Sequence, residues 1–247
     1  MSLIIEKSMS SNWLSNTWLV GDELGGHAVL IDTGGPTEPI LQAIADHRLT
    51  VTHVLCTHHH YDHVANNSVY SARFGCPICG HGSESPMFGD LDVELADGEE
   101  LVTGGLHIRA LHIPGHTIGQ LAFLVNEKLV FTGDTLFRRT VGGTRAPGHT
   151  TFEDIQRSLL EVLMRLPEET VVYPGHTETT TIGEEWEENP FIRMWRGLDR
   201  VTEQPCTASG QPATLLLRAV DYDGGYKCQV RFPDGTLDIV PGSRVVT

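Results

Sequence analysis

The densest group of side chains able to bind a metal ion lies in one stretch of seven residues that contains His58, His60, Asp62 and His63. It follows Thr52-His-Val-Leu-Cys, a short apolar run typical of a buried strand. In a loop after a strand, alternate side chains can turn the same way, so His58 and His60 can share one ion while Asp62 and His63 face a second. Imidazole and carboxylate both suit zinc and iron. Taken alone, a histidine-rich tract is equally consistent with an exposed loop.

Three later segments each place one further ligand type at the end of a predicted strand. They are Pro114-Gly-His116-Thr, Thr132-Gly-Asp134-Thr and Pro174-Gly-His176-Thr. Each contains a glycine, which permits a tight turn, and loops gathered at one end of a sheet are where sites are built. Together with the first stretch they supply five histidines and two aspartates, which is enough for two closely spaced metal ions.

The elements that must position these residues follow a repeated pattern of strand, polar loop and helix. The 3.6-residue period is clearest from Phe152 to Leu166, where Thr150 or Thr151 can cap the helix. The whole pattern predicts a mixed sheet flanked by helices. We expect strands over 13–20, 27–32, 52–56, 76–79 and 170–173, with several more between 101 and 131, and helices over 38–47, 64–74 and 152–166.

The composition changes near residue 201. Residues 1–200 carry all seven candidate ligands and are predicted to form the main domain. The polar, proline-containing segment 201–211 is typical of a linker, and 212–247 alternates as a small β-rich module with strands over 213–219, 226–232 and 237–240. A module of this size is too small for a robust core, so we expect it to lean on the main domain and to tune the reaction rather than perform it.

Composition narrows the function classes. The chain has 247 residues and a net charge of −15, from 32 acidic and 17 basic residues, so it should repel phosphate backbones and anionic lipid. We therefore expect no nucleic acid or membrane partner. No stretch approaches the ~20 apolar residues of a membrane span, the N-terminal residues lack signal-peptide features, and five scattered cysteines do not form a disulfide framework. These features favour a cytoplasmic location and leave a homo-oligomer open.

The order His58-x-His60-x-Asp62-His63, then His116, Asp134 and His176, resembles the metallo-β-lactamase-fold hydrolases over about Asn12 to Arg196. The resemblance implies an α/β fold, a four-layer αββα sandwich with the metals at one edge. It also implies a ligand assignment, in which Asp134 bridges the two ions. The first ion would be held by His58, His60 and His116, and the second by Asp62, His63 and His176.

Finer features are similar to the short bacterial glyoxalase II-like enzymes, which are hydroxyacylglutathione hydrolases without the long helical domain of the larger form. These features are Thr132-Gly-Asp-Thr-Leu-Phe137 and the segment that begins at Tyr173-Pro-Gly-His-Thr. The larger enzymes grip glutathione with a cation and a tyrosine at two positions where this chain has Gly143 and Glu178.

The chemistry expected of such a site is hydrolysis of a small-molecule thioester or ester. A water that bridges two divalent ions loses its proton near neutral pH, because bound metal lowers the pKa of water from 15.7 to about 7. Asp62 and Asp134 would be the catalytic carboxylates that act with this hydroxide. We expect zinc, with iron or manganese as alternatives, and a departing thiolate suits zinc well.

Two other interpretations belong to different classes. The persulfide dioxygenases share this fold and use one iron held by the equivalents of His58, His116 and Asp134, in keeping with the two-histidine, one-carboxylate pattern of non-haem iron. The C-terminal module resembles a Tudor-like small barrel, a binding module, through Gln229-Val-Arg-Phe-Pro-Asp-Gly and Val240-Pro-Gly-Ser-Arg.

Several other reactive side chains are expected to be structural or peripheral. His59 should face away from the metals. Cys76-Pro-Ile-Cys79 is predicted to pack as small apolar residues, because no second cysteine pair accompanies it. Asp32 and His112 could contact a ligand's second ring nitrogen. The cations Arg138, Arg139 and Arg145 could meet an anionic substrate or could be solvated.

Overall fold

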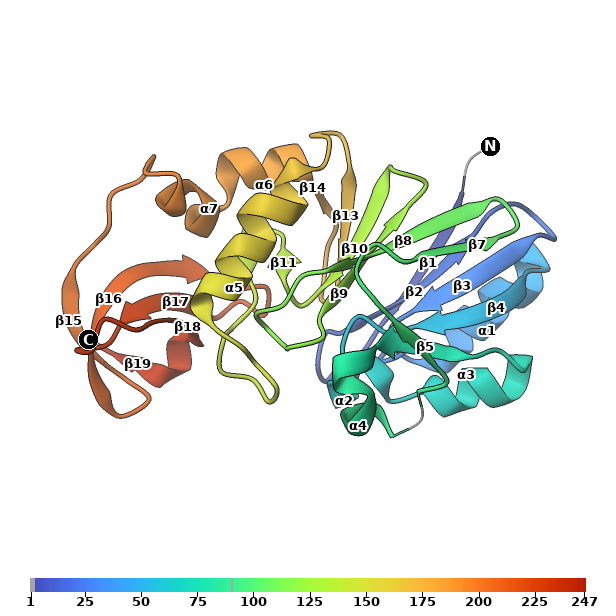
Figure 1. The fold of residues 1–247 in the computed structure, drawn as a ribbon, viewed down its shortest axis with the longest axis horizontal. Helices are drawn as coiled ribbons and strands as arrows, with labels where there is room; N and C mark the ends of the chain where they lie inside the picture. Colours follow the sequence, from blue (N-terminus) through green and yellow to red (C-terminus); the bar gives the residue numbers. More distant parts are fainter. Residues whose placement is uncertain (1–2, 90) are drawn as a thin grey trace.

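The computed structural model describes residues 3–89 and 91–247, and it confirms the expected sandwich of two mixed sheets between helical layers (Figure 1). The first sheet has six strands in sequence order. Its first three strands are antiparallel and the remaining neighbours are parallel. The strands are β1 (Ile4–Met9), β2 (Asn16–Gly21), β3 (His27–Ile31), β4 (Thr50–Leu55), β5 (Ile78–His81) and β6 (Val93–Leu95).

The second sheet has the order β14-β13-β10-β9-β8-β7 and is antiparallel except where β10 pairs with β13. A small hairpin, β11 (Leu136–Phe137) with β12 (Thr140–Val141), follows β10. The strands of the sheet are β7 (Glu100–Thr103), β8 (Leu106–His112), β9 (Leu121–Val125), β10 (Leu129–Gly133), β13 (Val171–Pro174) and β14 (Thr180–Thr181).

Apolar side chains hold the four layers together in three clusters. One cluster lies between the sheets and includes Trp18, Phe123 and Phe131. A second joins the first sheet to α1 and α3, and a third joins the second sheet to α5, α6 and α7. The helices are α1 (Thr37–His47), α2 (Tyr61–Val64), α3 (Asn67–Phe74), α4 (Ser85–Phe88), α5 (Phe152–Arg157), α6 (Ile182–Glu188) and α7 (Pro190–Trp195).

The helix predicted over 152–166 begins where expected, because Thr151 forms a capping box with Asp154. Only its first part is α-helical. Residues Ser158–Val162 form a π-helical turn and Leu163–Arg165 a 3-10 turn. Two further 3-10 turns, Gly82–Glu84 and Gly242–Arg244, complete the helical elements of the described chain. No helix in these residues is long and apolar enough to cross a membrane.

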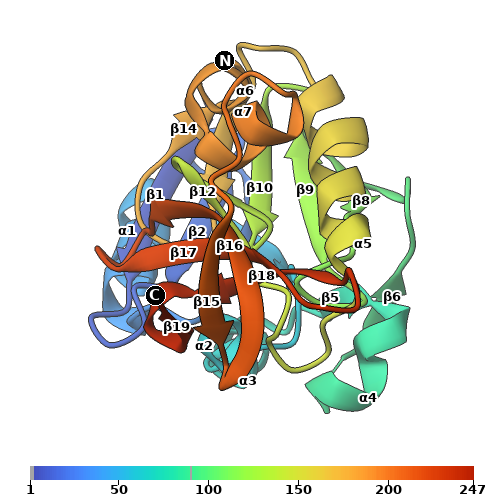
Figure 2. The same cartoon turned by 90° about the vertical axis from the view of Figure 1, so that its left-hand side faces the viewer.

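The C-terminal residues form a five-stranded antiparallel sheet that packs against the sandwich (Figures 1 and 2). The segment 201–211, which we predicted as a linker, contributes strand β15, because its backbone pairs with β16 and β19. The module has its own apolar cluster, yet Ala219 and Ile239 belong to the cluster under α5. The strands are β15 (Gln204–Ala208), β16 (Gln211–Val220), β17 (Tyr226–Arg231), β18 (Leu237–Pro241) and β19 (Val245–Val246).

Candidate metal centre

The loop after β4 and the first turn of α2 carry four of the seven candidate ligands. Strand β4 ends at Leu55, and the backbone then turns so that His58 and His60 approach each other from the loop. Asp62 and His63 stand on α2, which begins directly after His60. The fold thus presents all four side chains on one side of a short connection.

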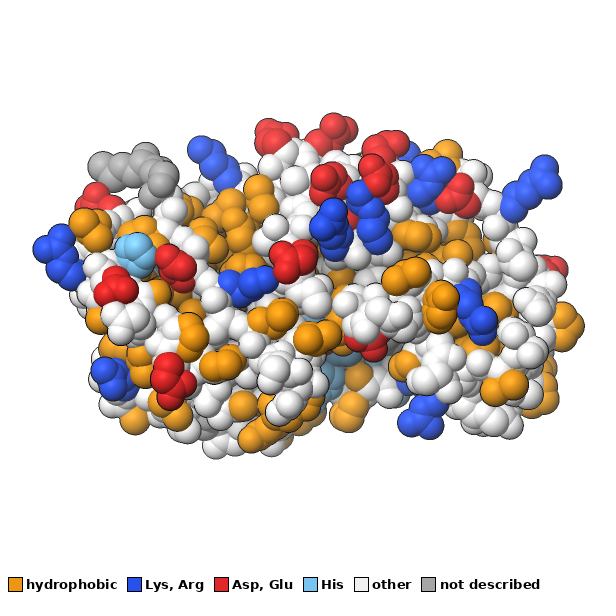
Figure 3. Space-filling view, turned by 180° about the vertical axis from the view of Figure 1, so that it is seen from behind, with side chains coloured by type: hydrophobic (Ala, Val, Ile, Leu, Met, Phe, Trp, Pro, Cys, Tyr) orange, Lys and Arg blue, Asp and Glu red, His pale blue; other side chains and the backbone are white. Residues whose placement is uncertain are grey.

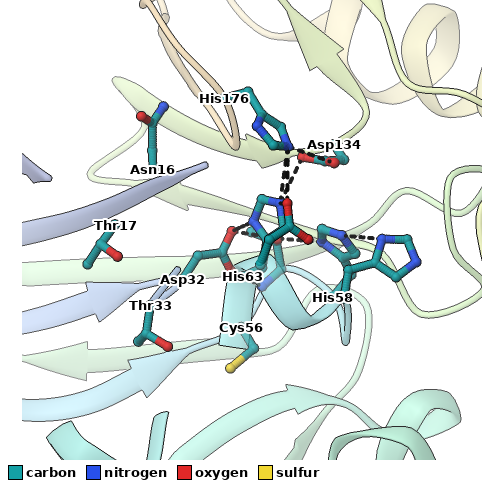
Figure 4. A network of polar contacts seen from close by, with 12 residues as sticks. Asn16, Thr17, Asp32, Thr33, Cys56, His58, His63, Asp134 and His176 are labelled. Atoms are coloured by element: carbon teal, nitrogen blue, oxygen red, sulfur yellow. Dashed lines mark hydrogen bonds and ion pairs between the residues drawn. The ribbon is translucent and has the colours of Figure 1, made fainter. Parts of the chain in front are cut away.

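The other three ligands follow strands of the second sheet, and the glycine just before each of them leaves no room for a Cβ. Gly133, just before Asp134, has a positive φ of 48°, and a Cβ there would lie 2.5 Å from Thr57 Oγ1. A Cβ on Gly175, just before His176, would lie 2.4 Å from Asp134 Oδ1. The close-up shows the side chains of both sheets meeting at one edge (Figure 4).

The ligand atoms form two adjoining sets. In the first, His60 Nδ1 lies 2.9 Å from His58 Nε2 and 3.1 Å from His116 Nε2. Three nitrogen atoms this close can hold one ion.

In the second set, His63 Nε2 and His176 Nε2 are 3.4 Å apart and lie 3.6 and 3.7 Å from Asp62 Oδ2. Asp134 lies between the sets, 3.3 Å from His63 Nε2, 3.2 Å from His176 Nε2 and 3.6 Å from His116 Nε2. The structure therefore brings all seven predicted residues together, with Asp134 where a bridging ligand would stand.

The outward-facing ring nitrogens show which atoms of the first set carry protons. Pro147 O and Gly143 O accept hydrogen bonds from His60 Nε2 and His116 Nδ1, at 2.8 and 2.9 Å. A carbonyl can only accept, so in a neutral ring the inward nitrogen is an unprotonated lone pair. Two such lone pairs 3.1 Å apart repel each other unless a cation lies between them. This geometry fits a divalent metal ion.

Asp32 fixes the ring of His63 in the same way. Its carboxylate accepts from Thr57 N at 2.8 Å, from Thr57 Oγ1 at 2.9 Å and from His63 Nδ1 at 2.9 Å. Because Thr57 Oγ1 donates to Asp32, it can accept from His58 Nδ1, which lies 3.0 Å away. Asp32 therefore orients one ligand directly and a second through Thr57, as expected of the partner of a metal-binding histidine.

Comparison with known proteins assigns the family. The sequence-family model of the metallo-beta-lactamase superfamily matches residues 11–176 of this chain. The chain belongs to the metallo-beta-lactamase superfamily.

Relatives at similar distance carry different names. An uncharacterized protein of Mycobacterium tuberculosis is 36% identical over 215 residues, which are 75% of this chain and 94% of that protein. The hydroxyacylglutathione hydrolase GloC of Haemophilus influenzae is 34% identical over 186 residues, covering 67% of this chain and 87% of GloC.

Two solved structures share the fold. ETHE1 from Myxococcus xanthus is 34% identical, with a TM-score of 0.69 and coverage of 76% of this chain and 84% of ETHE1. TTHA1623 in a di-iron-bound form is 31% identical, with a TM-score of 0.64 and coverage of 77% and 100%.

The electrostatics of this metallo-beta-lactamase-fold site suit a cation. Burial lowers the pKa of His58 well below its ordinary value and that of His116 to about 4. Burial opposes ionisation of Asp134, but the neighbouring imidazoles hold the pKa of its carboxyl well below the ordinary range. His63 is likewise buried, yet Asp134 and Asp32 raise its pKa. A metal ion that binds His63 would therefore have to displace a proton from this ring, whereas the carboxylate of Asp134 is already ionised and ready to bind it.

His59 makes its polar contacts outside the ligand set. Its Nδ1 lies 2.8 Å from Oε2 of Glu84, a fully buried carboxylate that also accepts from the backbone N–H groups of His59 and Gly119. Sequence reasoning missed Glu84, because a lone glutamate in a short turn carries no motif. Its role here is to fasten the ligand loop to the loop that holds His116.

The other reactive side chains divide between structural and peripheral positions. His112 contacts Ile118 O and stacks on His81 rather than touching a ligand. Arg139 pairs with Glu185 and Glu188 on α6, whereas Arg145 pairs with Asp238 of the module. Cys76 and Cys79 are both buried, and burial raises the pKa of the Cys79 thiol to about 12.

The C-terminal module reaches the metal centre, which the sequence did not indicate. Tyr222, in the β16–β17 connection, stacks on His176 with ring centroids 4.4 Å apart and an interplanar angle of 11°. Phe137 lies 4.8 Å from the Tyr222 ring. On β17, the nearly buried Lys227 holds its Nζ 3.1 Å from Asp221 Oδ2 and 5.6 Å from the Tyr222 ring centroid. The module therefore forms part of the wall of the site.

Proposed function

We propose that this chain is a dinuclear metal-dependent hydrolase that cleaves small-molecule thioesters in the manner of glyoxalase II. The observation that carries the proposal is the convergence of seven buried or half-buried ligand side chains in two sets that share Asp134. His58, His60 and His116 would hold one ion and Asp62, His63 and His176 the other. Bound divalent ions would lower the pKa of water and polarise a carbonyl.

The chain's own residues supply orientation and exclude solvent. Asp32 and the carbonyls of Gly143 and Pro147 keep the protons of three rings on the outer nitrogens, which leaves the inner ones free to ligate. The rings of Phe137 and Tyr222 pack against His176, which is 2% exposed. A dry, pre-oriented ligand set is what this chemistry requires of the protein, because a ligand that must reorient binds metal less tightly.

The thioester assignment is supported by the relatives named hydroxyacylglutathione hydrolase. Two residues bear on whether glutathione is the thiol part of the substrate. The Glu178 side chain is largely exposed, and its carboxylate pairs with Lys7 Nζ at 3.5 Å. The negative charge of Glu178 is therefore balanced by Lys7 and by solvent. Gly143 lies beside His116 and offers no side chain to a substrate. We expect S-lactoylglutathione to be hydrolysed with a high KM, because loss of remote binding appears chiefly in KM when the reacting centre is intact.

Zinc is our proposed metal, with iron or manganese as alternatives; the ligands suit all three, and TTHA1623 was solved with two iron ions. A cytoplasmic location also belongs to the proposal, and its support is that Cys76, Cys79, Cys206 and Cys228 are free thiols. The acidic chain argues against nucleic acid or a membrane as partner. A homo-oligomer stays open.

The likeness to ETHE1 favours one second candidate, an oxidoreductase that uses one iron ion to oxidise a persulfide. His58, His116 and Asp134 would hold that iron. His60, Asp62, His63 and His176 would then be unused, although their ligand atoms also converge with the others. This surplus of ligands is why we place the hydrolase first.

Metal analysis joined to activity separates the two candidates. The purified chain, saturated with metal and dialysed, should bind two divalent ions and release thiol from S-lactoylglutathione or a smaller thioester. His176→Ala should lower the stoichiometry to about one, whereas His47→Gln, a surface histidine paired with Glu6, should leave it at two. One iron per chain, with oxygen consumed on adding a persulfide and no thioester cleaved, would instead establish the second candidate.

A further inference from the structure

A cavity of about 360 Å³ lies where the module meets the sandwich, and a metal ligand forms part of its wall. A volume of this size falls at the lower end of small-molecule sites. From behind, histidine atoms are visible at the base of the junction between the two parts (Figure 3). The lining residues from the sandwich are His116, Gly143, Arg145 and Ala146, and those from the module are Ser209, Lys227, Ile239, Val240, Pro241 and Arg244.

The charge of this lining is opposite to that of the chain. Three of the lining residues are cationic, Arg145, Lys227 and Arg244, and none is acidic, although the chain as a whole carries a net charge of −15. Acidic side chains gather elsewhere, for example along α6 at the upper edge of the same view (Figure 3). A cationic recess on an acidic protein concentrates anions locally.

The three cations differ in how far they are neutralised. Lys227 is only 7% exposed and pairs with Asp221 at 3.1 Å, and Arg145 pairs with Asp238, its Nε lying 2.6 Å from Oδ2. Arg244 is exposed and forms no ion pair within residues 3–89 and 91–247. Lys227 also keeps two of its three N–H donors beyond the bond to Asp221. The cavity therefore retains one whole positive charge and spare donors.

We infer that this cavity binds an anionic group of the substrate, a carboxylate or a phosphate, beside the metal ligand His116. The inference rests on the proposed function, since it names the substrate class of the same site. Arg244 and Lys227 contact the anion, and the apolar side chains of Ile239, Val240 and Pro241 contact the short hydrocarbon that links it to the thioester. The module thereby selects the substrate while the sandwich supplies the reacting centre.

The kinetic test compares matched substrates, one with a single anionic group and one in which that group is absent or esterified. The lactoyl thioester of 3-mercaptopropionate carries a carboxylate, and its methyl ester does not; the lactoyl thioesters of 4′-phosphopantetheine and pantetheine make the corresponding phosphate pair. We expect the wild type to prefer one anionic partner over its neutral match. Arg244→Glu should lower the ratio of kcat/KM for anionic to neutral substrate at least tenfold, mainly through KM. The pair that responds identifies the anion.

Arg231→Glu is the matched control, because it makes the same charge change at a cation of the same module that pairs with Glu203 away from the cavity. It should leave the ratio unchanged. An equal ratio in wild type and Arg244→Glu for both pairs would overturn the inference, as would an equal fall with Arg231→Glu.

Calorimetry with the metal-loaded protein gives a readout that does not require turnover. The probes are non-hydrolysable thioethers, S-(2-hydroxypropyl)-3-mercaptopropionate and the corresponding ether of 4′-phosphopantetheine. One of them should bind wild type at least tenfold more tightly than Arg244→Glu. If it does and no thioester is cleaved, the proposed function fails and the anion site stands. If thioesters are cleaved and neither probe distinguishes the variants, the inference fails and the proposed function stands.

Discussion

Replacing Asp32 by asparagine tests whether hydrogen bonds outside the ligand set control metal binding. Asp32 is 2% exposed, and its Oδ2 accepts from both Thr57 Oγ1 and His63 Nδ1. Its φ is +54°, a region that asparagine also tolerates, so the change adds little backbone strain. In Asp32→Asn, Oδ1 can still accept from Thr57 N, which places the amide Nδ2 against His63 Nδ1. Two N–H donors then face each other.

The least costly response is for His63 to move its proton to Nε2, the atom that points at Asp62, Asp134 and His176. A protonated Nε2 cannot ligate. Loss of such a supporting carboxylate lowers metal affinity by about 10–100-fold, which corresponds to about 1.4–2.8 kcal/mol. Titration against a chromophoric chelator should show this loss for the ion held by His63, with a smaller change for the ion held by the first set.

Asp22→Asn is the matched control. Like Asp32, Asp22 accepts three hydrogen bonds, here all from backbone N–H groups, of Glu23, His27 and Gly105, but it lies in a turn remote from the ligands. It should lower the thermal unfolding temperature of the metal-free protein without altering metal affinity. If Asp32→Asn bound both ions as tightly as the wild type, or if Asp22→Asn weakened them equally, the proton assignment of His63 would be wrong.

Three further outcomes follow from the structure. Asp134→Ala should lower thioesterase activity more than any other single ligand change, because both ions lose a contact, while His59→Gln, assayed beside it, should retain metal and most activity. Tyr222→Phe should preserve stability, and Tyr222→Ala should cost about 1–3 kcal/mol through lost stacking and packing, measurable by urea unfolding. In native protein a thiol reagent should label the partly exposed Cys206 first, since burial holds the Cys79 thiol protonated to a pKa of about 12; equal labelling rates would contradict this.

Local signals in the sequence predicted the mixed sheet with flanking helices and the grouping of the ligands, whereas the four-layer sandwich was implied by the family resemblance. Each of His116, Asp134 and His176 follows a strand and adjoins a glycine. A strand end fixes the edge at which a side chain emerges, and two of the glycines occupy positions where a Cβ would collide with the site itself. A glycine next to a histidine or aspartate at a strand end therefore indicates a ligand held in a tightly packed site. Which ligand set holds which ion remains a prediction.

The positions that sequence reasoning missed are fixed by contacts between distant segments. Glu84 joins His59 to Gly119, and Tyr222 meets His176 from 46 residues further along the chain. The segment 201–211 has the polar, proline-containing composition of a linker, yet its strand β15 lies between β16 and β19 and pairs with both. Composition reports how a segment behaves alone, and pairing with a neighbouring strand overrides it.

Because the C-terminal module is packed firmly against the sandwich, we expect substrate selection and the geometry of the metal centre to be linked in this chain. Ile239 and Ala219 are buried in the same cluster as α5, so the module cannot swing away without exposing that apolar surface to water. Its backbone is also fixed locally, because Thr144 N donates to Ile239 O at 3.0 Å and Thr144 Oγ1 to Asp238 at 2.8 Å. The loop between Gly143 and Ala146 thus joins a carbonyl that orients His116 to the sheet that carries Lys227. A shift of the module should therefore disturb both the cavity and one metal ligand, which a freely tethered binding domain would not do.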